Sequence, residues 1–142
     1  MMSEILFLVG LVAVATLFGS MAFFSSVIAP LIFVKLDAAT AGRFVRSIFP
    51  WYYLVIAGLS LLATACLLAI HPLEAAILAI IALGAVFARQ FLMPRINNYR
   101  DRMVEGDNKA EKAFAGLHRL SVWINDGQLI GALTVLVLMG LA

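Results

Sequence analysis

The chain has 142 residues, of which 64% are hydrophobic and only 13% are charged, and its formal net charge is +2. A soluble domain averages about half apolar and about a quarter charged residues, and so short a chain buries too little surface to hide such an excess. The composition therefore excludes an ordinary soluble domain and predicts an integral membrane protein whose main partner is the lipid bilayer. The ten lysines and arginines form no aromatic-interleaved patch or binding motif, so we expect no nucleic-acid partner.

The first half of the chain predicts two membrane spans. Residues 5–34 contain no charged residue and exceed the roughly 20 residues that cross a bilayer, and Pro30 is expected to kink or end this span. Residues 48–70 form the second uncharged run. Trp51 and Tyr52 near its start are typical of the interface between lipid and water.

The second half predicts two further spans that each contain a charge. Residues 75–94 reach a spanning length only across Arg89, and residues 120–141 only if the span tolerates Asp126. We predict one domain over residues 1–142 with an all-α fold. It is an antiparallel bundle of four transmembrane helices, with helices 3 and 4 extended into the cytoplasm.

The distribution of basic residues predicts the orientation. Loops 35–47 and 95–119 lie on the same side of a four-span protein and hold nine of the ten lysines and arginines, Arg89 being the tenth. The positive-inside rule places both loops in the cytoplasm and both termini outside. The extensions of helices 3 and 4 are expected to meet at the turn signal in residues 105–108.

Two charged residues are expected at matching depth in the third and fourth spans. At 1.5 Å per residue, Arg89 lies about 7 Å and Asp126 about 9 Å from the inner edge of the membrane. Charged residues within spans usually face the bundle interior and pair, so we predict an ion pair between these two. The alternative is that Arg89 extends unaided to the lipid head groups.

Further polar residues gather at the same end. The candidate binding set is Arg89, Asn97, Arg100, His118, Asn125 and Asp126. His118 and Asn125 are seven residues apart and are expected on one helix face. One interpretation is a polar cavity that opens to the cytoplasm. The other is hydrogen bonding between helices that only holds the bundle together.

The remaining motifs limit the kinds of binding and catalytic site that we expect. Gly127 and Gly131 match GxxxG, which permits close helix packing, and an alternative is a helix unwound at Gly127 that binds an ion. The two histidines, His71 and His118, are expected at opposite membrane faces and cannot share a metal ion, so we predict no metal site. Without a catalytic triad, paired carboxylates or a phosphate-binding loop we assign no catalytic residue and no cofactor.

Several stretches together resemble the transmembrane-protein-205-like family, the bacterial DUF4149 proteins. They are Phe18-Gly19-Ser20-Met21 with Ala29-Pro30-Leu31-Ile32-Phe33, then Phe49-Pro50-Trp51-Tyr52-Tyr53, then Met93-Pro94-Arg95-Ile96-Asn97-Asn98 with Phe114 and Leu117-His118-Arg119-Leu120-Ser121-Val122. The resemblance covers nearly the whole chain. It implies a four-span protein of the bacterial inner membrane and carries no established reaction.

These observations favour three functional hypotheses. The first is a homo-oligomeric transporter or channel for a small solute or ion, because four spans are few for a complete pathway. The second is a structural or interaction protein whose polar cluster serves packing alone. The third is a haem- or porphyrin-linked membrane enzyme that uses His118 as a ligand or proton relay.

Overall fold

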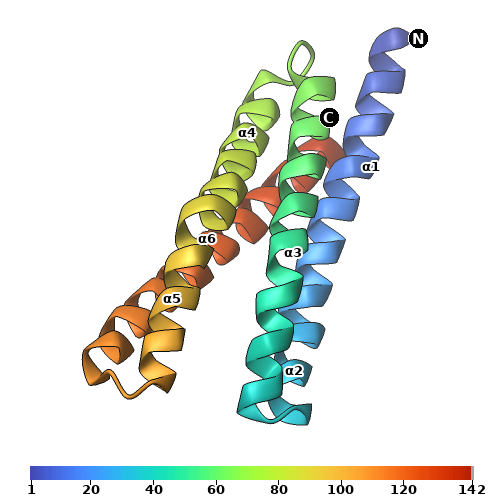
Figure 1. The fold of residues 1–142 in the computed structure, drawn as a ribbon. Coiled ribbons are helices and arrows are strands. Elements are labelled where there is room, and N and C mark those ends of the chain that lie inside the picture. Colours follow the sequence, from blue (N-terminus) through green and yellow to red (C-terminus); the bar gives the residue numbers. More distant parts are fainter. Residues whose placement is uncertain (142) are drawn as a thin grey trace.

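The computed structural model describes residues 1–141, which form helices joined by short connections (Figure 1). Four continuous helices are long and apolar enough to cross a membrane, with mean hydropathies of 1.5 to 2.4 in their most apolar windows. The prediction of an all-helical, multi-pass membrane protein is therefore confirmed. These helices are Met2–Lys35, Ala38–Leu67, Pro72–Val104 and Asn108–Leu141.

Two of the four helices contain a π-helical turn. The first consists of α1 (Met2–Phe23), the π turn η1 (Phe24–Ile28) and α2 (Ala29–Lys35). The second is α3 (Ala38–Leu67). The third consists of α4 (Pro72–Phe87), the π turn η2 (Ala88–Leu92) and α5 (Met93–Val104), and the fourth is α6 (Asn108–Leu141).

The connections lie alternately at the two ends of the molecule. Both termini and the connection 68–71 lie at one end, and the connections 36–37 and 105–107 lie at the other, which we call the basic end (Figure 1). The predicted second span reached residue 70, but α3 ends at Leu67 and residues 68–70 form a turn. The reason is Pro72, which excludes His71 from a helical conformation (φ −139°, ψ 72°).

At the basic end, the last two helices meet where the turn signal was predicted. Gly106 has φ +97°, a conformation that glycine adopts without strain. Asp107 accepts the backbone N–H of Lys109 and a 2.6 Å hydrogen bond from Arg102. The hydrogen bond from Arg102 holds the pKa of the Asp107 carboxyl below its usual range, so this acid stays charged and caps α6.

The core is made of apolar side chains from all four helices. The helix α3 packs between α1 and α4, and α6 contacts both α1 and α4. Fully buried side chains include Leu17, Ile56, Leu78 and Val135, one from each helix. This core fills the half of the bundle nearer the termini.

The GxxxG motif in α6 makes only one close contact. A Cβ atom on Gly131 would lie 3.2 Å from the side chain of Ile81 in α4, whereas one on Gly127 would meet nothing within 4 Å. The helix runs without interruption through Gly127, so the alternative of an unwound ion site there is wrong.

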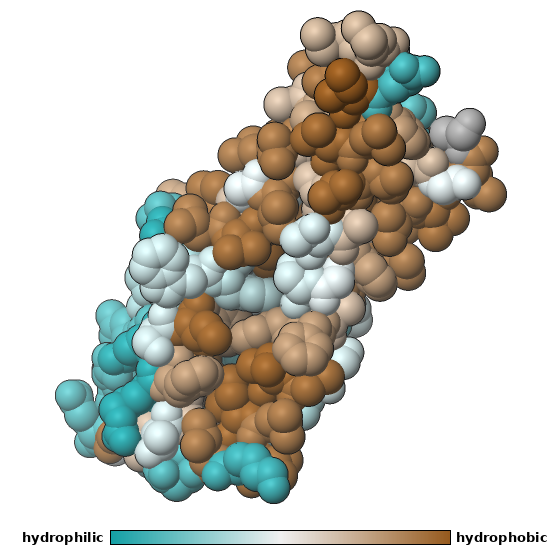
Figure 2. Space-filling view, turned by 90° about the vertical axis from the view of Figure 1, so that its right-hand side faces the viewer, coloured by the Kyte–Doolittle hydropathy of each residue, from teal (hydrophilic) through white to brown (hydrophobic). Residues whose placement is uncertain are grey.

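Large apolar side chains cover the outside of the bundle. Leu8, Ile80 and Ile130 are 58%, 69% and 64% exposed. On the face in Figure 2, hydrophobic residues cover the upper part and hydrophilic residues gather along the lower left edge. This is the surface expected of a protein surrounded by lipid.

At the basic end, one long side chain of α5 reaches the backbone of α3 beside a glycine. Arg100 of α5 donates a 3.1 Å hydrogen bond to the carbonyl of Ala38 in α3. Its guanidinium occupies the space in which a side chain on Gly42 would lie. The absence of a side chain at Gly42 therefore lets this hydrogen bond form.

We predict that Gly42→Ala lowers stability although alanine is the better helix former. The new methyl group displaces the Arg100 guanidinium and should cost about 1 kcal/mol through the lost hydrogen bond. The control is Gly58→Ala in the same helix, where a Cβ meets nothing within 4 Å and helix propensity favours alanine by about 1 kcal/mol. Melting temperatures in detergent check this, and equal shifts for the two variants would contradict it.

Candidate functional site

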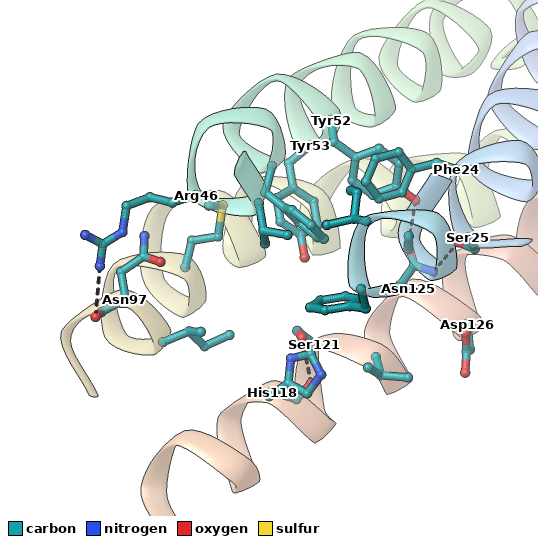
Figure 3. Close-up of a pocket in the computed structure, with 18 residues that line it drawn as sticks. Phe24, Ser25, Arg46, Tyr52, Tyr53, Asn97, His118, Ser121, Asn125 and Asp126 are labelled. Carbon is teal, nitrogen blue, oxygen red and sulfur yellow. Dashed lines mark hydrogen bonds between the residues drawn. The ribbon is translucent and has the colours of Figure 1, made fainter. Parts of the chain in front are cut away.

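A cavity of about 320 Å³ opens between the helices toward the basic end. Its walls come from η1 and α2, the first half of α3, α5 and the first half of α6. We call it the amphipathic pocket, because polar groups interrupt an otherwise apolar wall (Figure 3). The residues that line it include Phe24, Ser25, Phe33, Arg46, Phe49, Tyr52, Tyr53, Met93, Asn97, His118, Ser121, Asn125 and Asp126.

Aromatic rings form one wall of the pocket. Phe24 and Tyr52 stack with ring centroids 4.4 Å apart, and Phe49 meets Phe24 edge to face at 5.5 Å. Tyr53 continues the cluster at 5.8 Å from Phe49. Such pairs are favourable beyond simple burial, so they stabilise this arrangement of the rings.

A chain of two hydrogen bonds crosses the inner part of the pocket and joins three helices. The Tyr52 hydroxyl donates to Oδ1 of Asn125 at 2.6 Å, and Nδ2 of Asn125 donates to Oγ of Ser25 at 3.1 Å (Figure 3). We call these three residues the polar tie. Asn125 therefore serves both interpretations of the polar cluster, because it lines a cavity and also holds α6 to α3 and η1.

Several other polar groups of the pocket have no partner within the described part of the chain, and two of them are Tyr53, in the aromatic wall, and His118, on α6. Among residues 1–141, no group pairs with the hydroxyl of Tyr53 or with the imidazole of His118. Tyr53 is 2% exposed, and His118 stacks on Phe114 at 5.9 Å. A hydroxyl and an imidazole that are positioned but unpaired can donate to or accept from a bound molecule.

Proline explains the π turns beside the pocket. Each π turn ends two residues before a proline, Pro30 after η1 and Pro94 after η2. The N–H groups of Ala29 and Met93 reach the carbonyls of Phe24 and Ala88, five residues back. Proline has no N–H to donate, and local π geometry is a known way to pair the freed backbone groups in spans.

Of the two alternatives expected at Pro30, a kink or an end of the span, the second is wrong. The first helix does not end there and continues to Lys35. The π turn that precedes Pro30 supplies Phe24 and Ser25 to the pocket. Single π turns occur frequently at functional sites.

The structure brings together four of the six predicted site residues. Asn97, His118, Asn125 and Asp126 line the amphipathic pocket, and the predicted common face of His118 and Asn125 is confirmed. Arg89 and Arg100 do not line it.

The predicted ion pair between Arg89 and Asp126 does not form. None of the ion pairs within residues 1–141 joins these residues. Nε of Arg89 instead donates to the carbonyl of Pro50 in α3 at 3.2 Å, and Asp126 is exposed at the edge of the pocket. Matching depth fixed the height of the two residues but not the direction in which each side chain leaves its helix.

Sequence reasoning missed most of the lining residues, including Tyr52, Tyr53 and Arg46. Tyr52 and Tyr53 were interpreted through the interfacial aromatic belt, and Arg46 was assigned to loop 35–47. The helix α3 begins at Ala38, so Arg46 lies about two turns inside it. The missed signal is Asp37, which accepts the N–H groups of the two residues that follow Ala38 as a helix cap does.

The polar groups of the pocket suit hydrogen bonding and charge recognition. Within residues 1–141, no three histidine, cysteine, aspartate or glutamate side chains gather where they could hold one metal ion. Among the described residues that line the pocket, His118 carries the only imidazole and Asp126 the only carboxylate.

The comparison with protein families gives one match. The family model described as "Domain of unknown function (DUF4149)" matches residues 12–105, about two thirds of the chain. The chain belongs to the DUF4149 family. No curated protein and no solved structure matches it. The matched segment supplies Tyr52, Tyr53 and Asn97 to the pocket, whereas the wall from α6 lies outside it.

We predict that the effects of Arg89→Gln and Asp126→Asn on stability are additive. Arg89→Gln removes the hydrogen bond to Pro50 and should cost about 1 kcal/mol. Asp126→Asn should have little effect, because no group within residues 1–141 pairs with this exposed carboxylate. In chemical or thermal unfolding, the double variant should match the sum within about 0.5 kcal/mol. If the double variant loses clearly less stability than the sum, the two residues interact and the ion-pair prediction is correct.

Proposed function

We propose that this membrane protein is a carrier that binds a small amphipathic solute in the amphipathic pocket. The observation that supports this most directly is the pairing of an aromatic wall with two unpartnered polar groups, Tyr53 and His118, in one cavity. Its volume of about 320 Å³ lies at the lower end of the range of about 300–1,000 Å³ for small-molecule sites. An apolar wall with few polar contacts is the usual composition of such a site.

The packing of the core favours a carrier over a pore through one bundle. Beyond the polar tie, side chains such as Leu17, Ile56 and Val135 are completely buried and occupy the centre of the bundle. A solute in the pocket therefore meets packed side chains on its inner side. We include self-association in the proposal, because movement across the membrane then requires helices to rearrange or a second copy to contribute.

The orientation is part of the proposal. The clustering of lysines and arginines between Lys35 and Arg119 supports a cytoplasmic basic end and external termini in a bacterial inner membrane. In this orientation α5 and the start of α6 extend into the cytoplasm and the helices run antiparallel across the bilayer. We also propose that the chain is related to the transmembrane-protein-205-like proteins.

We predict that cysteines at the two ends react from opposite sides of the membrane. In a Cys66→Ala background, Ser3→Cys should react with an impermeant maleimide in right-side-out vesicles, and Asn108→Cys only in inverted ones. Labelling is measured by the mass shift of the protein. The reverse pattern would overturn the orientation without affecting the pocket.

We predict that an amphipathic compound protects the pocket from alkylation. Ser121→Cys, in the Cys66→Ala background, places a thiol in the pocket wall, and Asn108→Cys is the control outside it. N-ethylmaleimide is applied to protein in nanodiscs with decanoic acid, decanol or decylamine. At least one of the three compounds should slow alkylation at residue 121 and leave residue 108 unaffected.

Two tyrosine variants separate binding from packing. Tyr53→Phe removes an unpaired hydroxyl, so it should keep the melting temperature and weaken protection about fivefold. Tyr52→Phe breaks the polar tie and should lower the melting temperature. If none of the three compounds protects residue 121, the structural hypothesis replaces the carrier. If a compound protects but protein-containing vesicles take it up no faster than empty ones, the protein is a binding protein and not a carrier.

A further inference from the structure

A second cavity of about 340 Å³ lies at the basic end, between the start of α3 and the end of α5. Three arginines line it, Arg43, Arg46 and Arg100, against two acids, Asp101 and Glu105. We call it the arginine cavity. Its lining is predominantly cationic, and the carrier hypothesis as stated makes no use of it.

One side chain lines both cavities. Arg46 belongs to the wall of the amphipathic pocket and to the wall of the arginine cavity. It donates to Oδ1 of Asp101 at 2.7 Å and to the carbonyl of Asn97 at 3.1 Å. The Arg46 and Asp101 side chains are 44% and 59% exposed, so a competing anion can reach this ion pair.

The backbone of α3 also accommodates the guanidinium of Arg100 at the arginine cavity. Arg100 occupies the space left by the missing side chain of Gly42 and donates to the carbonyl of Ala38. Only one of its N–H donors is used in this hydrogen bond, and a guanidinium has five. Arg43 donates to Thr40 and is otherwise exposed.

We propose that the two adjoining cavities hold one anionic amphiphile, a phospholipid with a net negative headgroup. Its phosphate binds Arg43, Arg46 and Arg100, and the first part of one acyl chain lies against the aromatic wall of the amphipathic pocket. This inference deepens the proposed function and rests on it. Guanidinium groups match the geometry of phosphate oxygens, and basic pockets between membrane helices are sites for anionic headgroups.

The headgroup competes with Asp101 for Arg46. In the structure Asp101 neutralises Arg46, and a bound phosphate takes over that role. Free phosphate offers the same anion, but it cannot use the aromatic wall that begins beside Arg46. The arrangement therefore favours the phosphate of a lipid over free phosphate.

The test is a thermal titration of the purified protein in dodecyl maltoside micelles. The probes are dioleoylphosphatidylglycerol, dioleoylphosphatidylcholine with the same acyl chains, and inorganic phosphate. Phosphatidylglycerol should raise the melting temperature at concentrations about tenfold lower than phosphatidylcholine, as expected for one added charge-assisted contact. Inorganic phosphate should have little effect at matched concentration.

Variants with opposite expected signs identify the site. Arg43→Gln and Arg46→Gln should each weaken the response to phosphatidylglycerol about tenfold. Asp101→Asn should strengthen it, because the competitor for Arg46 is gone, even though the protein without added lipid becomes less stable. The control is Arg119→Gln, which removes the same charge from α6 outside both cavities and should leave the response unchanged. If Arg46→Gln does not fold, Arg43→Gln and Asp101→Asn carry the test.

Each contrary result has a distinct meaning. Equal responses to the two lipids, or an equal loss in Arg119→Gln and Arg43→Gln, would overturn the headgroup site. An equal response to inorganic phosphate would show an anion site that does not need lipid. Protection of residue 121 by a decyl compound without any preference for phosphatidylglycerol would overturn this inference and leave the proposed function standing. The absence of both effects would overturn both.

Discussion

The polar tie determines where the packed bundle gives way to a cavity. Tyr52, Asn125 and Ser25 come from three different helices and satisfy one another at 2.6 and 3.1 Å. Polar groups between packed helices are costly to leave unpaired, and these three pair with one another. Toward the termini the helices are joined by close apolar contacts, and toward the basic end they are held by arginines and leave space. The polar tie lies at the boundary between these two parts of the bundle.

The two π turns and their prolines shape the same region from both sides. Pro30 and Pro94 each remove a backbone donor, and the preceding turn widens to re-pair the chain. One of these turns supplies Phe24 and Ser25 to the pocket, and the other holds Arg89 against α3. Residues that disturb regular helix are therefore concentrated around the candidate site, as local departures from ideal geometry often are.

The sequence predicted the elements well because the membrane imposes simple requirements on length and polarity. The long apolar runs predicted the four helices, and the turn signal in residues 105–108 predicted where the last two meet. Within the site, the seven-residue spacing of His118 and Asn125 correctly placed both on one face. The partner of Arg89 could not be predicted, because the rotation of each helix about its axis follows from packing of the whole bundle. Arg46 was missed because an amphipathic helix start resembles a charged loop.

The hydrogen bonds between α3 and the third helix use two kinds of acceptor. Arg89 and Arg100 donate to the main-chain carbonyls of Pro50 and Ala38, and only Arg46 also meets a side chain, Asp101. A carbonyl is present whatever residue carries it, so replacing Ala38 by another amino acid leaves the acceptor in place. The Arg89 contact therefore imposes no side-chain requirement on the opposite helix, whereas the Arg100 contact requires the missing side chain at Gly42. A search for positions that change together across related chains would detect Arg46 with Asp101 and Arg100 with Gly42. It would pass over Arg89, although all three arginines connect the same pair of helices.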